Sequence, residues 1–210
     1  MTRDVIMYPM ARRVIVYASA MSRWQPDARG RLERAAVDLF STQGYAATTI
    51  PEIAARAGLT TRTFFRYFPD KREVIFDGDT IPTLARAFLA AAPAEVPPMQ
   101  LLVSGMCSIA DERFPPRREA MRRLRPIIAA EPALRERDAR KRDDLTEAVR
   151  VGFVERGVSE HAASALAAFG IGTLHAALDQ WLADDDTDLP SRTILRCIAD
   201  VRRALDELSV

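Results

Sequence analysis

Within residues 49–68, side chains that can bind phosphates and base edges are gathered into one short stretch. Thr60, Thr61, Arg62 and Arg66 all lie between positions 60 and 66. A guanidinium group can make two parallel hydrogen bonds to guanine, and threonine hydroxyls suit phosphate oxygens. This chemistry requires the side chains to lie on the outward face of a short, rigid element.

The spacing of apolar residues in this stretch predicts two short helices joined by a tight turn at Gly58. Ile50, Ile53 and Ala57 recur at intervals of three and four, as one helical face requires. The second helix opens on Thr60, whose hydroxyl can cap free backbone N–H groups. A helix this short depends on its neighbours for stability. A supported short helix with a polar outer face is typical of one that enters the major groove of DNA.

The distribution of charge along the chain agrees with this prediction. The 210-residue chain is 48% hydrophobic and 28% charged, which is ordinary for a folded globular protein. Its net charge is only +1, but residues 1–71 hold 11 Lys or Arg against 6 Asp or Glu. The remaining residues hold 19 against 23. A basic head on a mildly acidic body fits a protein that contacts nucleic acid through its N-terminal part.

The rest of the chain has helical periodicity from residue 29 to its C-terminal end, without a sustained alternating pattern of strand type. We therefore expect an all-α fold of about nine helices with short connections. A long fourth helix is expected to begin after Asp70 and to run through Phe76 to about Ala91. A sixth helix is expected to start at Pro115-Pro116 and to fade around Pro126.

The landmarks from Arg29 to Lys71 resemble the DNA-binding domain of the tetracycline-repressor (TetR) family of bacterial transcription regulators. These landmarks are Ala35-Ala36-x-x-Leu39-Phe40-x-x-x-Gly44-Tyr45, Thr48-Thr49-Ile50-x-x-Ile53-Ala54-x-x-Ala57-Gly58 and Thr63-Phe64-Phe65-x-Tyr67-Phe68-x-x-Lys71. The resemblance implies a helix-turn-helix domain over residues 28–72, with its motif at 49–68. It also implies a ligand-binding and dimerisation domain over 73–210. Residues 1–27 would then be an N-terminal arm, for which disorder is one interpretation.

The expected recognition helix has an inner and an outer face. Leu59, Phe64 and Phe68 are spaced to face inward. We expect Arg62 to contact guanine, and Thr61 and Phe65 are candidates for a thymine methyl group. The family often has tyrosine where Phe65 stands. The expected DNA-binding residues are Thr49, Thr60, Thr61, Arg62, Thr63, Phe65, Arg66, Tyr67 and Lys71.

For the body, the resemblance implies a small-molecule effector and a homodimer formed by the last two helices. The ligand-pocket candidates are Phe88, Met106, Met121 and Arg122, with plain core packing as the alternative for the methionines. An acyl-coenzyme A type of effector is one extension of the resemblance. The arginine cluster around Arg122 is interpreted first as a solvated face. The expected dimer-interface residues are Leu166, Gly170, Leu174, Ala177, Trp181, Ile198, Val201 and Leu205.

Neither a catalytic nor a metal site is predicted. Cys107, Cys197, His161 and His175 lie apart from one another and from any set with metal-ligand spacing. We also find no nucleophile elbow or phosphate-binding glycine loop. No apolar run approaches the ~20 residues that a membrane helix needs. The expectation is a cytoplasmic protein without a cofactor or a membrane partner, and not an enzyme.

These observations favour a sequence-specific transcriptional regulator, a ligand-responsive repressor that binds a palindromic double-stranded DNA operator as a dimer. Two other functions stay open. One is a helical ligand-binding or scaffold protein without specific DNA binding. The other, less favoured, is an enzyme that carries an accessory helix-turn-helix.

Overall fold

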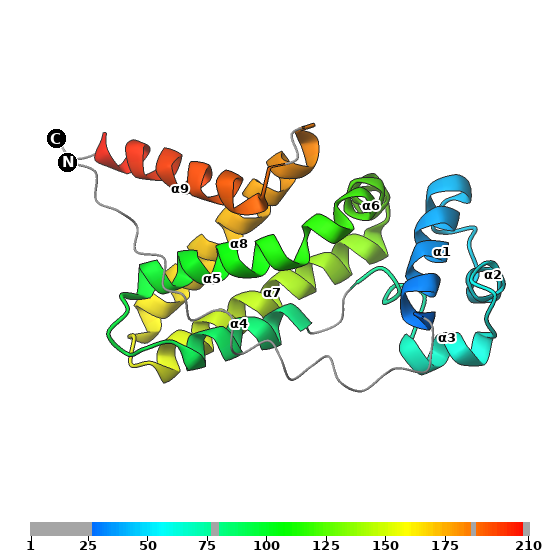
Figure 1. Cartoon of the computed structure of the whole chain (residues 1–210), viewed down its shortest axis with the longest axis horizontal. Coiled ribbons are helices and arrows are strands. Elements are labelled where there is room, and N and C mark those ends of the chain that lie inside the picture. Colours follow the sequence, from blue (N-terminus) through cyan, green and yellow to red (C-terminus); the bar gives the residue numbers. More distant parts are fainter. Residues whose placement is uncertain (1–26, 77–79, 186–187, 208–210) are drawn as a thin grey trace.

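The computed structural model describes residues 27–76, 80–185 and 188–207, and these residues form nine α-helices and one short 3₁₀ helix. The prediction of an all-α fold is confirmed. The first three helices form a head at one end of the elongated molecule, and the other six form the body (Figure 1). The expected N-terminal arm lies outside the described residues except for Asp27, whose side chain accepts a hydrogen bond from the backbone N–H of Gly30.

The head consists of α1 (Ala28–Gln43), α2 (Ile50–Arg56) and α3 (Thr61–Tyr67). The inward faces of the three helices meet in one core. Leu32, Phe40, Ile53 and Phe64 are fully or almost fully buried there. Because α2 and α3 have only seven residues each, this shared core is what holds them in helical form.

The fourth helix does not begin where the sequence suggested. The Asp70 carboxylate accepts hydrogen bonds from the backbone N–H groups of Arg72 and Glu73, but it caps a turn, and α4 (Thr80–Ala91) begins ten residues after Asp70. The prediction of one long helix from Asp70 is therefore wrong. The physical reason lies in burial. Val74, Ile75 and Phe76 are consecutive and all three are buried against the head, whereas a helix would turn consecutive side chains to different sides.

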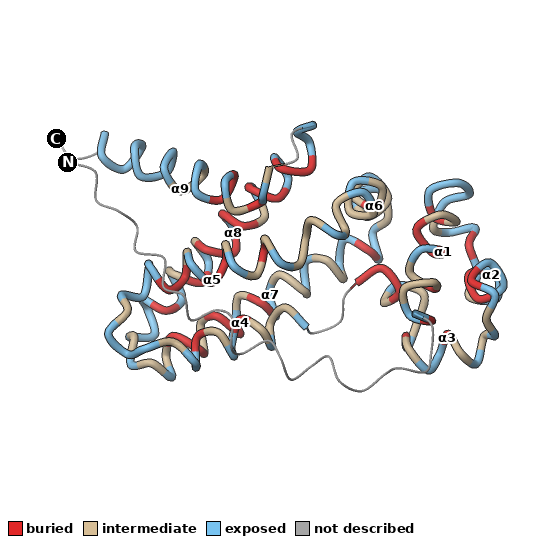
Figure 2. Tube along the Cα trace, viewed as in Figure 1, coloured by how far each residue is buried: buried red, intermediate tan, exposed pale blue. Residues whose placement is uncertain are grey.

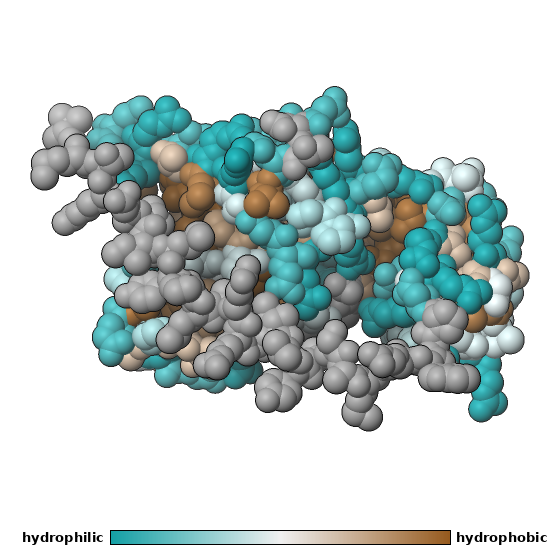
Figure 3. Space-filling view, viewed as in Figure 1, coloured by the Kyte–Doolittle hydropathy of each residue, from teal (hydrophilic) through white to brown (hydrophobic). Residues whose placement is uncertain are grey.

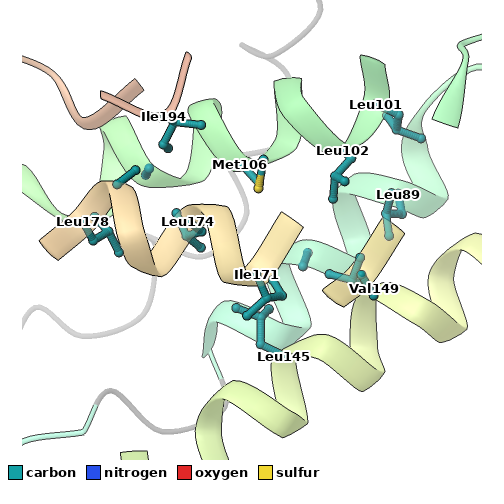
Figure 4. Close-up of a cluster of buried hydrophobic side chains, with 14 of the residues drawn as sticks. Leu89, Leu101, Leu102, Met106, Leu145, Val149, Ile171, Leu174, Leu178 and Ile194 are labelled. Carbon is teal, nitrogen blue, oxygen red and sulfur yellow. The ribbon is translucent and has the colours of Figure 1, made fainter. Parts of the chain in front are cut away.

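The body contains the remaining helices and a second core. Its elements are α4, α5 (Pro98–Arg113), η3 (Pro115–Arg117), α6 (Arg118–Ala130), α7 (Pro132–Glu155), α8 (Glu160–Ala183) and α9 (Pro190–Asp206). Helix α8 packs against α5, α7 and α9, and α4 packs against α5 and α7. Figure 4 shows apolar side chains from α4, α5, α7, α8 and α9 converging in this core.

Helix α6 continues past its internal proline. The sequence predicted that this helix would fade around Pro126, but α6 extends to Ala130. A proline inside a helix removes one backbone hydrogen bond and costs stability. Tertiary packing offsets that cost, because Leu124 is buried and Ile127 and Ile128 pack against the core of the head.

Head and body are joined by direct packing as well as by the chain. Leu134 of α7 is fully buried in the head core. Arg123 of α6 donates a hydrogen bond of 2.9 Å to the Asp38 carboxylate on α1. Arg137 of α7 binds the Glu73 carboxylate, with 3.1 Å between Nη2 and Oε2, and both side chains are only 16% exposed. Helices α6 and α7 therefore fix the position of the head.

Helix α8 is the only helix in the described part of the chain that is long and apolar enough, by composition, to cross a membrane. A buried core helix meets the same criterion. Ten residues of α8 are buried, and the helix packs against α5, α7 and α9. Its apolar composition is therefore explained by its place in the core (Figure 2).

Cys107, Cys197 and His175 of the body are half-buried, whereas His161 is exposed. Burial raises the pKa of the Cys107 thiol to about 11, and the nearby Asp111 carboxylate acts in the same direction. Burial, together with the Arg142 guanidinium, lowers the pKa of His175 to about 4. At pH 7, Cys107 is therefore a neutral thiol and His175 a neutral imidazole. Among the described residues, His, Cys, Asp and Glu side chains do not gather in groups of three or more that could hold a metal ion.

Candidate nucleic-acid interface

The start of α2 is held by a reciprocal cap. The Thr49 hydroxyl accepts a hydrogen bond from the backbone N–H of Glu52, and the Glu52 carboxylate accepts bonds from the Thr49 backbone N–H and hydroxyl, both at 2.7 Å. The hydrogen bonds from Thr49, led by that of its hydroxyl, lower the pKa of the Glu52 carboxyl. The cap satisfies two backbone donors that the helix itself cannot. It therefore sets where α2 begins.

The turn between α2 and α3 depends on a glycine and on an arginine from α1. Gly58 has φ +65°, a left-handed conformation that side chains disfavour, and a Cβ atom there would lie 2.8 Å from Arg31 Nη2. Arg31 donates hydrogen bonds to the carbonyl oxygens of Ala57 and Gly58. The turn is thus fastened to α1. Arg31 was not among the predicted site residues, because nothing in local spacing links it to residues 26 and 27 positions away.

Helix α3 combines a buried anchor with an exposed neighbour. Phe64 is 0% exposed, and the next residue, Phe65, is 54% exposed. Their rings meet edge to face at 5.7 Å between centroids. The Thr60 hydroxyl caps the helix by accepting a hydrogen bond from the Thr63 backbone N–H, and it bonds the Thr63 hydroxyl at 3.0 Å. The anchor and the cap together point Phe65 away from the protein.

The two arginines of α3 are exposed and differ in their surroundings. Arg62 makes no hydrogen bond or ion pair within the described part of the chain. The Arg66 guanidinium lies 4.9 Å from the centre of the Tyr67 ring and bonds the Tyr67 hydroxyl at 3.1 Å. Thr61, Thr63 and Tyr67 are half-buried. The helix therefore presents one uncommitted guanidinium, one stacked guanidinium and an apolar ring on a single outward side.

Lys71 lies in a different environment from the one expected. It is in a turn and not at the start of the long helix that was expected after Asp70. Its ammonium group donates hydrogen bonds of 2.8 Å to the carbonyl oxygens of Tyr45 and Thr48, and it lies 4.1 Å from the centre of the Tyr45 ring. Burial, the largest influence, lowers its pKa. In this structure Lys71 holds the loop between α1 and α2.

Replacing Lys71 with methionine is expected to lower the free energy of unfolding by about 1–2 kcal/mol, because two carbonyl oxygens lose a charged donor. Urea titration would measure the loss. Arg72→Met is the matched control. The exposed Arg72 guanidinium bonds the nearby Asp70 carboxylate, and such an exposed pair should contribute under about 1 kcal/mol. Unchanged stability of the Lys71 variant, with a DNA salt slope lower by about one, would instead assign Lys71 to a phosphate.

The body brings only two of the four ligand-pocket candidates together. Phe88 of α4 and Met106 of α5 line a small cavity of about 40 Å³. Met121 packs at the edge of the body core and does not line this cavity. Arg122 is exposed and bonds the Asp185 carboxylate at 3.1 Å. The cavity therefore excludes the charged member of the predicted set.

Four residues expected at a dimer interface lie inside the chain's own core. Gly170, Leu174, Ala177 and Trp181 of α8 are buried, and the indole N–H of Trp181 donates a hydrogen bond of 2.7 Å to the Asp188 carbonyl. The prediction for these residues is corrected, because α8 packs against α5, α7 and α9 of its own chain and these four side chains are covered there.

The other expected interface residues lie nearer the surface. Leu166 and Ile198 are half-buried at the edge of the core, whereas Val201 and Leu205 are exposed. Leu195 of α9, which the sequence analysis did not select, is 51% exposed. Figure 3 shows apolar side chains gathered over α9.

The head is similar to the DNA-binding part of known regulatory proteins. Residues 33–77 match the family model described as bacterial regulatory proteins, tetR family. The HTH-type transcriptional regulator TcmR of Streptomyces glaucescens is 42% identical over 77 residues, which are 35% of this chain and 33% of TcmR. The aligned part thus spans about a third of the length of that relative.

Solved structures extend the likeness to most of the chain at low identity. A TetR-family transcriptional regulator from Bordetella parapertussis 12822 has a TM-score of 0.51 and 18% identity, covering 83% of this chain and 93% of that one. Thermus thermophilus FadR, a TetR-family repressor solved in complex with lauroyl-CoA, has a TM-score of 0.50 and 22% identity, covering 81% and 91%. At this level of identity the likeness establishes the fold.

Proposed function

We propose that the chain is a cytoplasmic, ligand-responsive transcriptional repressor that binds operator DNA as a homodimer. Support comes from residues 33–77, which match the model of the tetR family of bacterial regulatory proteins. Residues 28–72 form its DNA-binding domain in this proposal, and residues 73–210 its ligand-binding and dimerisation domain. The observation that carries it is the outward side of α3. There a buried phenylalanine anchors a helix that exposes Arg62, Phe65 and Arg66.

In the proposed complex, α3 enters the major groove. Arg62 contacts guanine through its two-pronged guanidinium, and Phe65 packs on a thymine methyl group. Thr49, Thr60, Thr61, Thr63, Arg66 and Tyr67 contact or flank the phosphates, which position the helix without reading sequence. Lys71 stabilises the loop between α1 and α2. Two of its ammonium hydrogens are bonded to carbonyl oxygens, so at most one is left for a phosphate.

The proposed dimer joins the outward sides of α8 and α9. Leu195, Val201 and Leu205 give α9 an exposed apolar stripe. On α8, small residues recur at intervals of three and four on the exposed side, and a Cβ atom at Gly172 would meet nothing within 4 Å. Two copies joined here would carry one head each, and heads about 34 Å apart fit successive turns of a palindromic site.

The proposed ligand response uses the body cavity. The protein would have two conformations, one whose heads fit DNA and one whose heads do not. An effector that binds the second conformation more tightly lowers the affinity for the operator, at most by the ratio of its affinities for the two conformations. Support comes from the contacts of α6 and α7 with the head, since the Asp38–Arg123 and Glu73–Arg137 pairs join the two parts directly. FadR, which shares the fold, was solved with lauroyl-CoA.

Selection of bound fragments from genomic DNA tests the proposed function, followed by mobility-shift titration of the enriched site at several salt concentrations. We expect a palindromic site bound at least about 10³-fold more tightly than random DNA, with affinity that falls steeply as salt rises. Equal affinity for all sequences even at low salt would support a helical ligand-binding protein without specific DNA recognition. The shifted complex should contain two protein chains.

A further inference from the structure

We propose that Arg31 of α1 is a positioning residue for DNA recognition, because it fixes the angle at which α3 leaves α2. Arg31 thereby sets how selectively Arg62 and Phe65 read bases, without binding a base itself. The part of this inference that concerns selectivity rests on the proposed function. The part that concerns the turn rests on contacts within the head.

The C-terminal end of α2 needs hydrogen-bond donors, because the last carbonyl oxygens of a helix have no partner inside it. The turn itself supplies two. The backbone N–H of Gly58 bonds the Ala55 carbonyl at 2.9 Å, and this glycine is left-handed. The N–H of Leu59 bonds the Ala54 carbonyl at 2.8 Å, which completes a Schellman motif. Neither bond reaches the carbonyl oxygen of Ala57.

Arg31 supplies the missing donor from α1. Its Nη2 atom donates hydrogen bonds to the carbonyl oxygen of Ala57 and, at 3.3 Å, to that of Gly58. A positive charge at the C-terminal end of a helix is also favoured by the partial negative charge there. The next residue on α1, Leu32, is fully buried and holds the backbone in place. The guanidinium therefore ties the turn to a fixed point of α1.

The guanidinium can approach the turn because residue 58 is a glycine. A Cβ atom there would lie 2.8 Å from Arg31 Nη2, so a side chain would displace the guanidinium from the carbonyl oxygens. The φ of +65° at the same residue separately favours glycine. Gly58 thus meets two requirements at once, the conformation of the turn and the close approach of Arg31.

The turn determines where α3 begins. Helix α2 packs closely against both α1 and α3, and the cap of α3 at Thr60 comes only two residues after Gly58. The buried Phe64 holds the middle of α3. A fixed start and a fixed middle together define the axis of this seven-residue helix.

The axis of α3 decides which DNA contacts can form. Arg62 and Phe65 must reach base edges, and such groups have to be held within about 0.5 Å of the productive geometry. Attraction to phosphates tolerates a larger displacement, because it depends on charge more than on alignment. Loss of Arg31 is therefore expected to weaken binding to the operator more than binding to random DNA.

A direct contact between Arg31 and a phosphate is the alternative explanation. The Nε and Nη1 atoms of its guanidinium make no hydrogen bond within the described part of the chain. A phosphate contact would make Arg31→Met weaken binding to every sequence equally and lower the salt slope by about one. The two explanations therefore differ in what can be measured.

Hydrogen exchange of the full-length protein without DNA tests the turn. Arg31→Met removes the guanidinium and keeps a good helix former. Arg34→Met is the matched control, since it removes an exposed arginine of the same helix that pairs with Asp27. The amide protons of Leu59 and Phe64 should exchange at least about tenfold faster in Arg31→Met, relative to those of α8, because a charged donor is lost. Exchange as slow as in Arg34→Met would overturn the proposal.

Mobility-shift titration on the operator and on random DNA tests the consequence for recognition. The ratio of the two affinities should fall at least about fivefold in Arg31→Met, the lower end of what one base contact contributes. The affinity for random DNA and the salt slope should stay those of the wild type, and Arg34→Met should keep the wild-type ratio. An equal loss on both DNAs would overturn the proposal and assign Arg31 to a phosphate. An equal fall of the ratio in both variants would overturn it as well, because loss of charge alone would account for the result.

Circular dichroism checks that both variants are folded at the temperature of the titrations. If Arg31→Met does not fold, Arg31→Lys keeps a charge on a shorter side chain and should show both changes to at least about twofold. Faster exchange with an unchanged affinity ratio would overturn the role in selectivity. A wild type that binds all DNA equally would contradict the proposed function, and hydrogen exchange would still decide whether Arg31 holds the turn.

Discussion

Phe64→Ala is expected to destabilise the head by about 3–5 kcal/mol, the usual cost of removing a fully buried aromatic side chain. Phe64 is 0% exposed and contacts both Phe65 and Phe68. It anchors a helix of only seven residues, and native domains are stable by only about 5–15 kcal/mol in total. The variant should therefore lose operator binding because α3 is no longer held. Urea unfolding followed by circular dichroism measures the loss.

The adjacent phenylalanine provides the control. Phe65 is 54% exposed on the same helix, so Phe65→Ala should change the free energy of unfolding by less than about 1 kcal/mol. Its effect should be on DNA binding, with a preference for thymine reduced at one position. Substitution of deoxyuridine for that thymine removes only the methyl group, and it should weaken the wild type but not the variant. A stability loss of equal size in both variants would contradict the assigned orientation of α3.

Arg62→Ala is expected to weaken binding to the operator by about 1–3 kcal/mol, or about 5- to 150-fold in Kd. The physical reason is the loss of a bidentate contact to one guanine. Arg62 is exposed and uncommitted within the described residues, so its removal should leave the stability of the head unchanged. Mobility-shift titration on the operator and on single-base variants measures both affinity and preference.

The pattern across DNA sequences identifies what Arg62 contacts. Preference at one base pair should relax, and the other positions should keep theirs. An equal loss on every sequence, with a salt slope lower by about one, would instead show that Arg62 contacts a phosphate. Arg86→Ala removes an arginine of the body that pairs with Glu155, and it should leave DNA affinity unchanged.

The contacts between head and body bear on how a ligand signal reaches the DNA. The head is held by α6 and α7 through the buried Leu124 and Leu134 and through ion pairs. A change in the packing of α7 against α4 at the cavity would thus act on an element that also touches the head. In the proposed mechanism this direct contact takes the role that a continuous helix from Asp70 would have had.

Local sequence determined most of the head. The Thr49 and Thr60 caps, the glycine turn and the three- and four-residue apolar spacing each depend on residues within a few positions of one another. Such short-range features can be recognised in the sequence without knowledge of the rest of the chain. They were sufficient to predict the helix-turn-helix and the opposite orientations of Phe64 and Phe65.

Only the tertiary structure decided which apolar or charged residue served which purpose. Periodicity marks an apolar face of α8 but cannot tell whether the chain's own helices or a second copy covers it. In the structure Leu102 of α5 lies against Gly170, and Arg118 of α6 lies over the Trp181 ring. Periodicity also could not reveal that Lys71 would be bonded to loop carbonyls 23 and 26 residues away. The physical reason is the same in both cases. Burial and pairing depend on contacts between residues far apart in the chain, and these contacts exist only once the helices have packed.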